Sequence, residues 1–379
     1  MFPDHIYTHA WAGQERKKLG NCDPGLLEKC VYALTLLGYL AESGLPFLFK
    51  GGTSILLHLP EIRRLSIDID IVTPVADTEL NRVVARIGQT APFIRCEESV
   101  RGTVAGRNIL PHRRHFKFWF RSGRARPEEG CVLLDVVREE HWPHDTLKRP
   151  IRTAFLVPDR EIMVTLPTIE SLLADKLAAF APTTTGVRLR HPSDNAPGEI
   201  MQVAKQLFDV GVLFEHAVDF AAVARVYDGA QAQESGYRGN LHSRDATLTD
   251  TLNACLGVTG ARVRGAPANN FPDTPLLMEG FDRLKGHLTQ GRADDNARRV
   301  LAARAGVLAA HLRANRPFDF AAARYKQSEA QLAALRGASL RGHVHEWIDR
   351  IKPVSAEAYH YWYLALHAEV QSHISISQT

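Results

Sequence analysis

The sequence is poor in cysteine and contains no long hydrophobic run. Its 379 residues include five cysteines, an odd number that lie far apart and lack the CxxC spacing typical of zinc sites. This pattern argues against a disulfide framework and a structural zinc site, so we expect reduced thiols that are mostly buried. No stretch reaches the roughly 18 apolar residues of a membrane span, and no signal-peptide pattern opens the sequence. We therefore expect a cytoplasmic protein without a membrane partner.

The sequence also lacks a strong excess of one charge. Lysine and arginine total 46 against 42 aspartate and glutamate residues, a net charge of +4. Such a small excess permits a polyanionic partner and does not require one. Hydrophobic residues make up 45% and charged residues 23%, which is typical of globular proteins and excludes extensive disorder. The length is sufficient for two or three domains.

The hydrophobic periodicity changes near the middle of the sequence. The first half combines a helical stripe at residues 25–42 with strand-like segments at 46–49, 66–72, 115–121, 131–137 and 162–166. From Thr168 onward the spacing is almost entirely helical, at residues 168–181, 197–215, 217–229, 294–314, 317–335 and 355–372. Residues 182–198 and 257–275 are rich in Pro, Gly, Ser and Thr, which indicates long loops. The sequence therefore predicts an α+β protein, with a mixed domain at residues 1–166 and a mostly helical domain at 167–379.

Two aspartates lie two residues apart on one predicted strand. The segment 66–72 alternates strictly and carries Asp68 and Asp70. Side chains two apart on a strand point to the same face, with Cα atoms about 6.5 to 7 Å apart. Magnesium prefers hard oxygen ligands and retains waters and substrate phosphates, so this pair is suited to a metal–triphosphate complex. A DxD pair by itself is more often a solvated strand face than a metal site.

A glycine pair precedes this strand by about fifteen residues. Gly51 and Gly52 follow a short predicted strand and are followed by Thr53 and Ser54 at the start of a short helix. Backbone N–H groups at such a helix start favour a phosphate, and Lys50 adds a positive charge. The turn is weak evidence alone. Together with the DxD strand, however, it brings phosphate donors and metal ligands to one end of neighbouring strands.

Four segments resemble one known family in its own order. Lys50–Thr53 (KGGT) and Arg64–Asp70 (RLSIDID) resemble the signature of the AbiEii/AbiGii nucleotidyltransferases, the toxins of type IV toxin–antitoxin systems within the DNA polymerase β-like superfamily. Residues 170–179 (ESLLADKLAA) resemble that family's helix with an essential lysine. Residues 205–210 (KQLFDV) resemble a later motif, in which a helical aspartate follows a basic residue by four. The resemblance covers roughly residues 24–215.

The resemblance implies a fold and a metal site. The fold is a polymerase-β-like nucleotidyltransferase domain with a mixed sheet flanked by helices, followed by a variable helical domain. Asp68 and Asp70 would hold Mg²⁺, or Mn²⁺, which bridges the phosphates of an NTP substrate. The third carboxylate of the superfamily lies on an adjacent strand, for which Asp135 in VLLDVV is the natural candidate. The alternative for Asp135 is a strand-end carboxylate that is hydrogen-bonded to a turn.

Two residues of the helical domain are further candidates. Lys176 lies at or beside the apolar stripe of its helix, so either it extends to solvent or it meets a triphosphate or a carboxylate. The resemblance favours phosphate. Asp209 lies four residues after Lys205, a spacing that commonly gives a surface ion pair. The resemblance instead implies that Asp209 lies near the nucleotide or the acceptor hydroxyl and orients Lys176, with both residues contributed to the cleft.

Arg64 and Ser66 flank the aspartates on the same segment. Ser66 shares the face of Asp68 and Asp70, where its hydroxyl can bind phosphate or can be satisfied within the strand. Arg64 can stabilise charge that develops on the leaving pyrophosphate, or it can be an ordinary loop arginine.

Residues 101–126 contain eight Arg or Lys residues and no acid, with aromatic residues between them. We expect Phe116, Phe118 and Phe120 to be core residues and the arginines to favour a nucleic-acid surface. The resemblance implies an RNA acceptor such as the tRNA 3′ end, growth arrest in phage defence, and a cognate antitoxin. The alternatives are transfer to a small molecule or a protein side chain, and a non-catalytic NTP- or RNA-binding module. We assign no role to residues 216–379.

Overall fold

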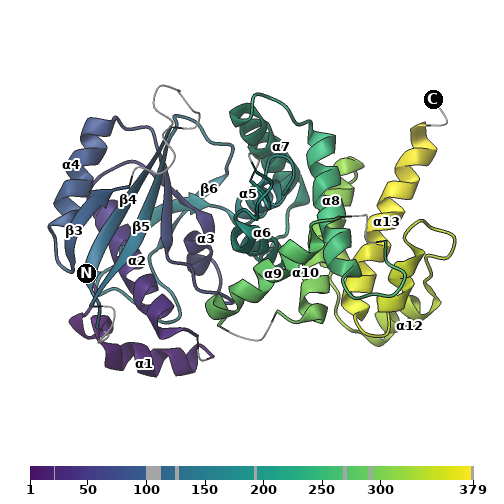
Figure 1. Cartoon of the computed structure of the whole chain (residues 1–379), viewed down its shortest axis with the longest axis horizontal. Coiled ribbons are helices and arrows are strands. Elements are labelled where there is room, and N and C mark those ends of the chain that lie inside the picture. The colour runs from purple at the N-terminus through teal and green to yellow at the C-terminus, as the bar shows by residue number, and fades with distance from the viewer. Residues whose placement is uncertain are drawn as a thin grey trace. The chain divides into compact units, whose positions relative to one another are not determined.

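The computed structural model describes residues 1–20, 22–99, 112–123, 128–191, 194–267, 271–289 and 293–376, with side chains up to His367. The chain divides into two compact units (Figure 1). We call Met1–Thr168 with Gly286–Gly291 the sheet unit, and Ile169–Lys285 with Arg292–Thr379 the helical unit. None of the described helices combines the length and apolarity needed to cross a membrane.

The sheet unit is built on a five-stranded mixed sheet in the order β1-β2-β5-β4-β3, in which only the central pair β2 and β5 is parallel among these strands. A two-stranded antiparallel sheet, β6 with β7, completes it. The strands are β1 (Leu48–Lys50), β2 (Asp68–Thr73), β3 (Phe93–Glu98), β4 (His112–Arg121), β5 (Glu129–Arg138), β6 (Thr146–Pro150) and β7 (Met163–Pro167). The helices are η1 (Asp4–Tyr7), α1 (His9–Lys18), α2 (Pro24–Glu42), α3 (Gly51–Ser54), η2 (Ile55–Leu57) and α4 (Asp77–Gly88). This arrangement confirms the predicted α+β class.

Helix α2 covers one face of the sheet. It begins at Pro24, where the Asp23 carboxylate accepts hydrogen bonds from the N–H groups of Gly25 and Leu26. Its apolar side packs on β2 and β5, and the ring of Tyr32 stacks on that of Phe120. Phe116, Phe118 and Phe120 of β4 are all buried on this side, as the alternation of the strand predicts. The residues that alternate with these phenylalanines are partly exposed and lie on the opposite face of the sheet.

The helical unit surrounds a central helix. Its elements are α5 (Ile169–Ala179), α6 (Ile200–Leu213), α7 (Phe220–Tyr237), α8 (Arg244–Gly260), α9 (Thr274–Leu284), α10 (Asp295–Arg313), α11 (Phe320–Ala323), α12 (Glu329–Gly337), η4 (Glu346–Ile351) and α13 (Ala356–Ile376), while η3 (Lys285–His287) begins in this unit and ends in the sheet unit. Helix α10 packs against α6, α8 and α13, and Asp294 caps its first turn. Gly306 permits the indole of Trp362 to lie directly on α10, because a Cβ there would be 2.7 Å from the ring.

The structure departs from the predicted helical pattern in two places. Residues 317–335 form two short helices rather than one, because Gln327 has a φ of 53° and the Ser328 hydroxyl caps a new helix start. The loop predicted at 257–275 is shorter, since α8 continues to Gly260 and α9 begins at Thr274. All five cysteines are free, and Cys22, Cys30 and Cys255 are buried.

Candidate active site

The predicted carboxylates lie on one face of the sheet, opposite α2. Asp68 and Asp70 are both on β2 and therefore share a face. Asp70 is the direct cross-strand partner of Asp135 on the parallel strand β5. Directly opposed side chains lie about 5 Å apart on the same face, so Asp135 joins the two aspartates of β2. The parallel pairing of β2 with β5, which is separated by more than 50 residues of chain, creates this grouping.

Asp70 and Asp135 form a row across the sheet, and a basic residue lies on the neighbouring strand at each end of this row. Lys50 of β1 is the cross-strand partner of Asp70, and His115 of β4 is the partner of Asp135. The Nδ1–H of His115 donates to Oδ1 of Asp135 at 2.6 Å. The side chains of His115 and Asp135 are 26% and 34% exposed, so the row is accessible to a ligand. The sequence did not indicate His115, because its partner depends on the register between β4 and β5.

This arrangement fits a divalent cation that shares its ligands with a substrate. Among the described residues, no group of three or more His, Cys, Asp and Glu side chains converges as a ready-made metal cage. Magnesium does not require one, since it is usually bound by one or two carboxylates together with waters and substrate phosphates. The half-exposed pair Asp68 and Asp70 supplies such a set, while Asp135 is held by His115.

The glycine turn lies directly against the carboxylates. Gly51 has a φ of +79°, and a Cβ at this position would lie 1.9 Å from Oδ2 of Asp70. Only glycine meets both requirements. The Thr53 hydroxyl donates to the Asp68 carbonyl at 2.6 Å and the Ser54 hydroxyl to the Gly51 carbonyl at 2.8 Å, and both side chains are fully buried. These two hydroxyls therefore hold the turn against β2 and do not face a phosphate in this conformation.

Arg64 and Ser66 lie over the second glycine. A Cβ at Gly52 would be 2.5 Å from Nη2 of Arg64 and 2.9 Å from Oγ of Ser66. The guanidinium and the hydroxyl therefore both lie against the turn. Helix α3 is only four residues long, so its dipole is small, and positive charge at the turn comes from the Arg64 and Lys50 side chains.

In the helical unit, Lys176 of α5 forms an ion pair with Asp209 of α6. Nζ of Lys176 lies 3.4 Å from Oδ2 of Asp209, and the two side chains are only 8% and 3% exposed. Of the two predicted environments for Lys176, the structure therefore shows a buried carboxylate. Lys205 is also buried, so a solvated surface pair between Lys205 and Asp209 does not describe this helix face.

A buried aspartate that the sequence did not indicate anchors the loop after α5. Asp250 of α8 accepts hydrogen bonds from both the N–H and the hydroxyl of Thr183, and likewise from Thr184. The hydroxyl of Thr251 also donates to the carbonyl of Phe180, the first residue after α5. The end of the helix that carries Lys176 is thereby fixed to α8.

Part of the basic segment lies on the same sheet face as the carboxylates. Lys117 and Trp119 share the parity of His115, and the guanidinium of Arg95 lies 4.3 Å from the centre of the Trp119 ring. Arg114 has the other parity and forms paired hydrogen bonds with Glu98. Arg101, Arg107, Arg124 and Arg126 lie outside the described residues.

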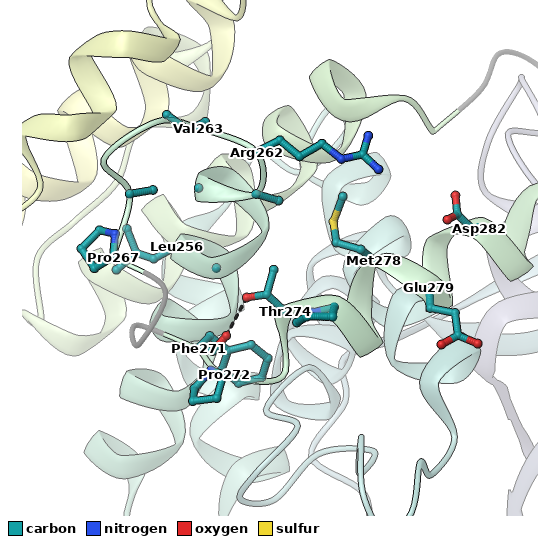
Figure 2. Close-up of a pocket in the computed structure, with 15 residues that line it drawn as sticks. Leu256, Arg262, Val263, Pro267, Phe271, Pro272, Thr274, Met278, Glu279 and Asp282 are labelled. Carbon is teal, nitrogen blue, oxygen red and sulfur yellow. Dashed lines mark hydrogen bonds between the residues drawn. The ribbon is translucent and has the colours of Figure 1, made fainter.

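A pocket of about 660 Å³ lies in the helical unit between the end of α8 and helix α9 (Figure 2). Its wall is largely apolar, and the Thr274 hydroxyl bonds back to the Phe271 carbonyl within it. Its charged residues already have partners: Arg262 pairs with Asp295, Glu279 with Arg283, and Asp282 with Arg298 and Lys285. It contains none of the predicted site residues, and we assign it no part in the chemistry.

Comparisons with known proteins identify the family. A family model described as nucleotidyl transferase AbiEii toxin, type IV TA system, matches residues 35–304 and so includes every predicted site residue. The chain is similar to JHP933 from Helicobacter pylori, with 14% identity over 82% of this chain and 96% of that one and a TM-score of 0.38. It is also similar to an antigenic nucleotidyltransferase-like protein from Paracoccidioides brasiliensis, with 15% identity over 56% of this chain and 90% of that one and a TM-score of 0.35. No curated protein matches the chain. The family match covers more than half of the sequence and confirms the resemblance: this chain is a nucleotidyltransferase that belongs to the AbiEii toxin family of type IV toxin–antitoxin systems.

Proposed function

We propose that this protein transfers a nucleoside monophosphate from an NTP to a hydroxyl of an RNA acceptor, with Mg²⁺ or Mn²⁺ held by Asp68 and Asp70. The observation that carries the proposal is the cross-strand row of Asp70 and Asp135, beside Asp68 and directly over the Gly51 turn. It supports binding of a triphosphate at the turn with its metal ion at the carboxylates. A cation there would offset charge on the triphosphate during transfer.

The other side chains of the site bind phosphate, accept a proton and stabilise charge. Arg64 and Ser66 bind phosphate oxygens over Gly52, and Lys50 adds positive charge beside Asp70. Asp135 accepts the proton of the attacking hydroxyl, while His115 holds the carboxylate in position. The oxygen of the acceptor attacks the α-phosphorus in line, the bond to the β-phosphate oxygen breaks, and pyrophosphate leaves. In this proposal Lys176 offsets charge on the triphosphate, and Asp209 orients the Lys176 ammonium.

An RNA acceptor is supported by the sheet face beside the carboxylates. Lys117 and Trp119 of β4 extend the row of His115 along that face and supply a cation and an aromatic ring, a combination that favours single-stranded nucleic acid. We propose the tRNA 3′ end as the acceptor, growth arrest as the outcome, and an antitoxin as the partner that counteracts it.

The test is transfer of label from each of the four α-³²P-NTPs to total tRNA, to other RNA, to protein and to small hydroxyl compounds. We expect label on tRNA that requires Mg²⁺ and is lost in Asp68→Asn, Asp70→Asn and Lys176→Ala. Asp159→Asn is the matched control, because Asp159 is an exposed acid of the same unit that forms an ion pair with the N-terminus. Label on protein or on a small molecule would contradict the acceptor, and NTP binding without any transfer would contradict the reaction.

A further inference from the structure

A segment from the second half of the chain forms part of the sheet unit beside the phosphate-binding residues. After α9 the chain enters the sheet unit within η3, at Gly286–Gly291, and the helical unit resumes at Arg292 before α10. His287–Thr289 runs antiparallel to Ile62–Leu65, with Arg64 and Leu288 as bridge partners. Leu288 and Thr289 are buried, so this pairing is part of the interior.

The pairing holds the backbone on both sides of Arg64. The Leu65 N–H donates to the His287 carbonyl at 2.7 Å, and the Thr289 N–H donates to the Arg63 carbonyl at 3.1 Å. The Thr289 hydroxyl donates to the Ile62 carbonyl. Residues 62–65 belong to none of the described strands, so these bonds satisfy main-chain groups that a loop would otherwise leave to water.

Arg64 is the residue that this pairing positions. Its side chain is buried, its Nη1 donates to the Leu65 carbonyl at 3.3 Å, and its Nη2 lies over Gly52 beside the Ser66 hydroxyl. A displacement of its backbone by 1 Å would move the guanidinium either into the turn or away from it. Displacements of that size in a binding group cost up to about a hundredfold in rate.

We propose that His287–Thr289 is a positioning element of the nucleotide site and that Thr289 acts on the substrate through Arg64. This inference rests on the proposed nucleotide binding and deepens it: the phosphate contacts of the sheet unit depend on a segment inserted between α9 and α10. Thr289 is a positioning residue and does not itself touch the nucleotide. The role is specific to the hydroxyl, because valine has the same shape and β propensity but cannot donate to the Ile62 carbonyl.

The test measures the affinity of each Mg²⁺–NTP, as a non-transferable α,β-methylene analogue, for wild type and three variants. Thr289→Val removes the donor, Thr289→Ser retains it, and Gly286→Ala is the matched control because a Cβ there meets nothing within 4 Å. We expect Thr289→Val to raise Kd about five- to tenfold, because a misplaced Arg64 guanidinium loses part of the charge-assisted hydrogen bonding that it gives to phosphate. We expect Thr289→Ser and Gly286→Ala to remain within twofold of wild type. Amide hydrogen exchange at Leu65 should accelerate in Thr289→Val alone.

A double-mutant cycle with Arg64→Ala separates positioning from general loosening. If Thr289 acts through Arg64, Thr289→Val adds less than twofold to Kd once Arg64 is removed. An equal effect in both backgrounds, or an unchanged Kd in Thr289→Val when wild type binds, overturns this inference and leaves the proposed function intact. If wild type binds none of the analogues, the proposed function fails and this inference fails with it. If Thr289→Val does not fold, Thr289→Ala replaces it, and Kd is measured for this variant with and without Arg64→Ala to decide between these outcomes.

Discussion

Nζ of Lys176 and Oδ2 of Asp209 lie 3.4 Å apart in the interior of the helical unit, one on α5 and the other on α6. Burial removes both groups from water, and their mutual attraction offsets that cost only while both are present. The intact pair therefore adds little to the stability of the fold, but loss of either partner alone is strongly destabilising. It keeps a charged amine in an environment that is largely shielded from water.

Substitutions in this pair should separate stability from activity. Asp209→Leu leaves the buried Lys176 ammonium without this carboxylate and should lower the free energy of unfolding by about 3 to 5 kcal/mol. The double variant Lys176→Met/Asp209→Leu should recover most of this stability, as measured by urea unfolding. It should nevertheless show no nucleotidyl transfer. The exposed pair Glu279 and Arg283 is the control, and Glu279→Gln should cost less than about 0.5 kcal/mol. Recovery of transfer in the double variant would exclude a role for the pair in the reaction.

Two glycines with the same φ offer a matched test of the turn. Gly44 and Gly51 both have φ of +79°, but a Cβ meets nothing within 4 Å at Gly44 and lies 1.9 Å from Asp70 Oδ2 at Gly51. Gly44→Ala should therefore cost only the backbone strain of about 1 to 2 kcal/mol and leave transfer intact. Gly51→Ala should cost more in thermal unfolding and abolish transfer, because it displaces the Asp70 carboxylate. Equal losses in the two variants would show that the contact with Asp70 has no consequence.

Removal of His115 should affect turnover more than substrate binding. His115→Ala removes the hydrogen bond that orients Asp135, so we expect kcat to fall by about tenfold or more with little change in KM for the NTP. His115→Asn places an amide N–H near the position of Nδ1 and should restore part of the lost kcat. A change confined to thermal stability, with kcat unaltered, would assign His115 a structural role.

The stability of the protein should fall in mild acid because of His58. Burial, assisted by the nearby Arg149, lowers the pKa of His58 from 6.5 to about 4, while its hydrogen bond to the Pro167 carbonyl opposes the change. The folded state therefore holds His58 neutral where the unfolded chain is protonated. Its contribution is complete above pH 6.5 and is lost progressively as pH falls toward 4. Between pH 7.5 and 5 this group should account for about 2 kcal/mol of lost stability.

The measurement is the free energy of urea unfolding at the two pH values, for wild type and His58→Gln. Glutamine retains a donor for the Pro167 carbonyl and does not titrate in this range, so the variant should lose about 2 kcal/mol less than wild type. The same pH dependence in both proteins would place the acid sensitivity elsewhere.

Local patterns, together with the family resemblance, were sufficient to name most of the candidate site residues. The period of a strand puts Asp68 and Asp70 on one face, and the apolar stripe of α5 places Lys176 at its buried side. Asp135 was proposed because the resemblance implies a third carboxylate on an adjacent strand, and the parallel register brings it opposite Asp70. His115 was missed because a histidine in an alternating strand acquires its partner only from the register across β4 and β5, which no local signal encodes.

The remaining failures also involve contacts between distant parts of the sequence. Asp250 has the appearance of an ordinary helix residue, and its four bonds to Thr183 and Thr184 depend on how α8 packs beside the loop after α5. Helices α8 and α9 were not predicted, because the Pro- and Gly-rich residues between them obscured their ends. The hydrogen bond of Thr289 could not be predicted either, since its partner, Ile62, lies 227 residues earlier.

The return of the chain at His287–Thr289 has a practical consequence for anyone who expresses this protein in pieces. A fragment that stops at Thr168 contains every strand of the sheet unit but leaves the backbone of Ile62–Leu65 bare, a short unpaired edge that invites self-association. A single cut after Thr168 therefore cannot release the complete sheet unit. Truncation studies, split-protein designs and minimal toxins will need to carry this segment, either in its native context or supplied as a peptide.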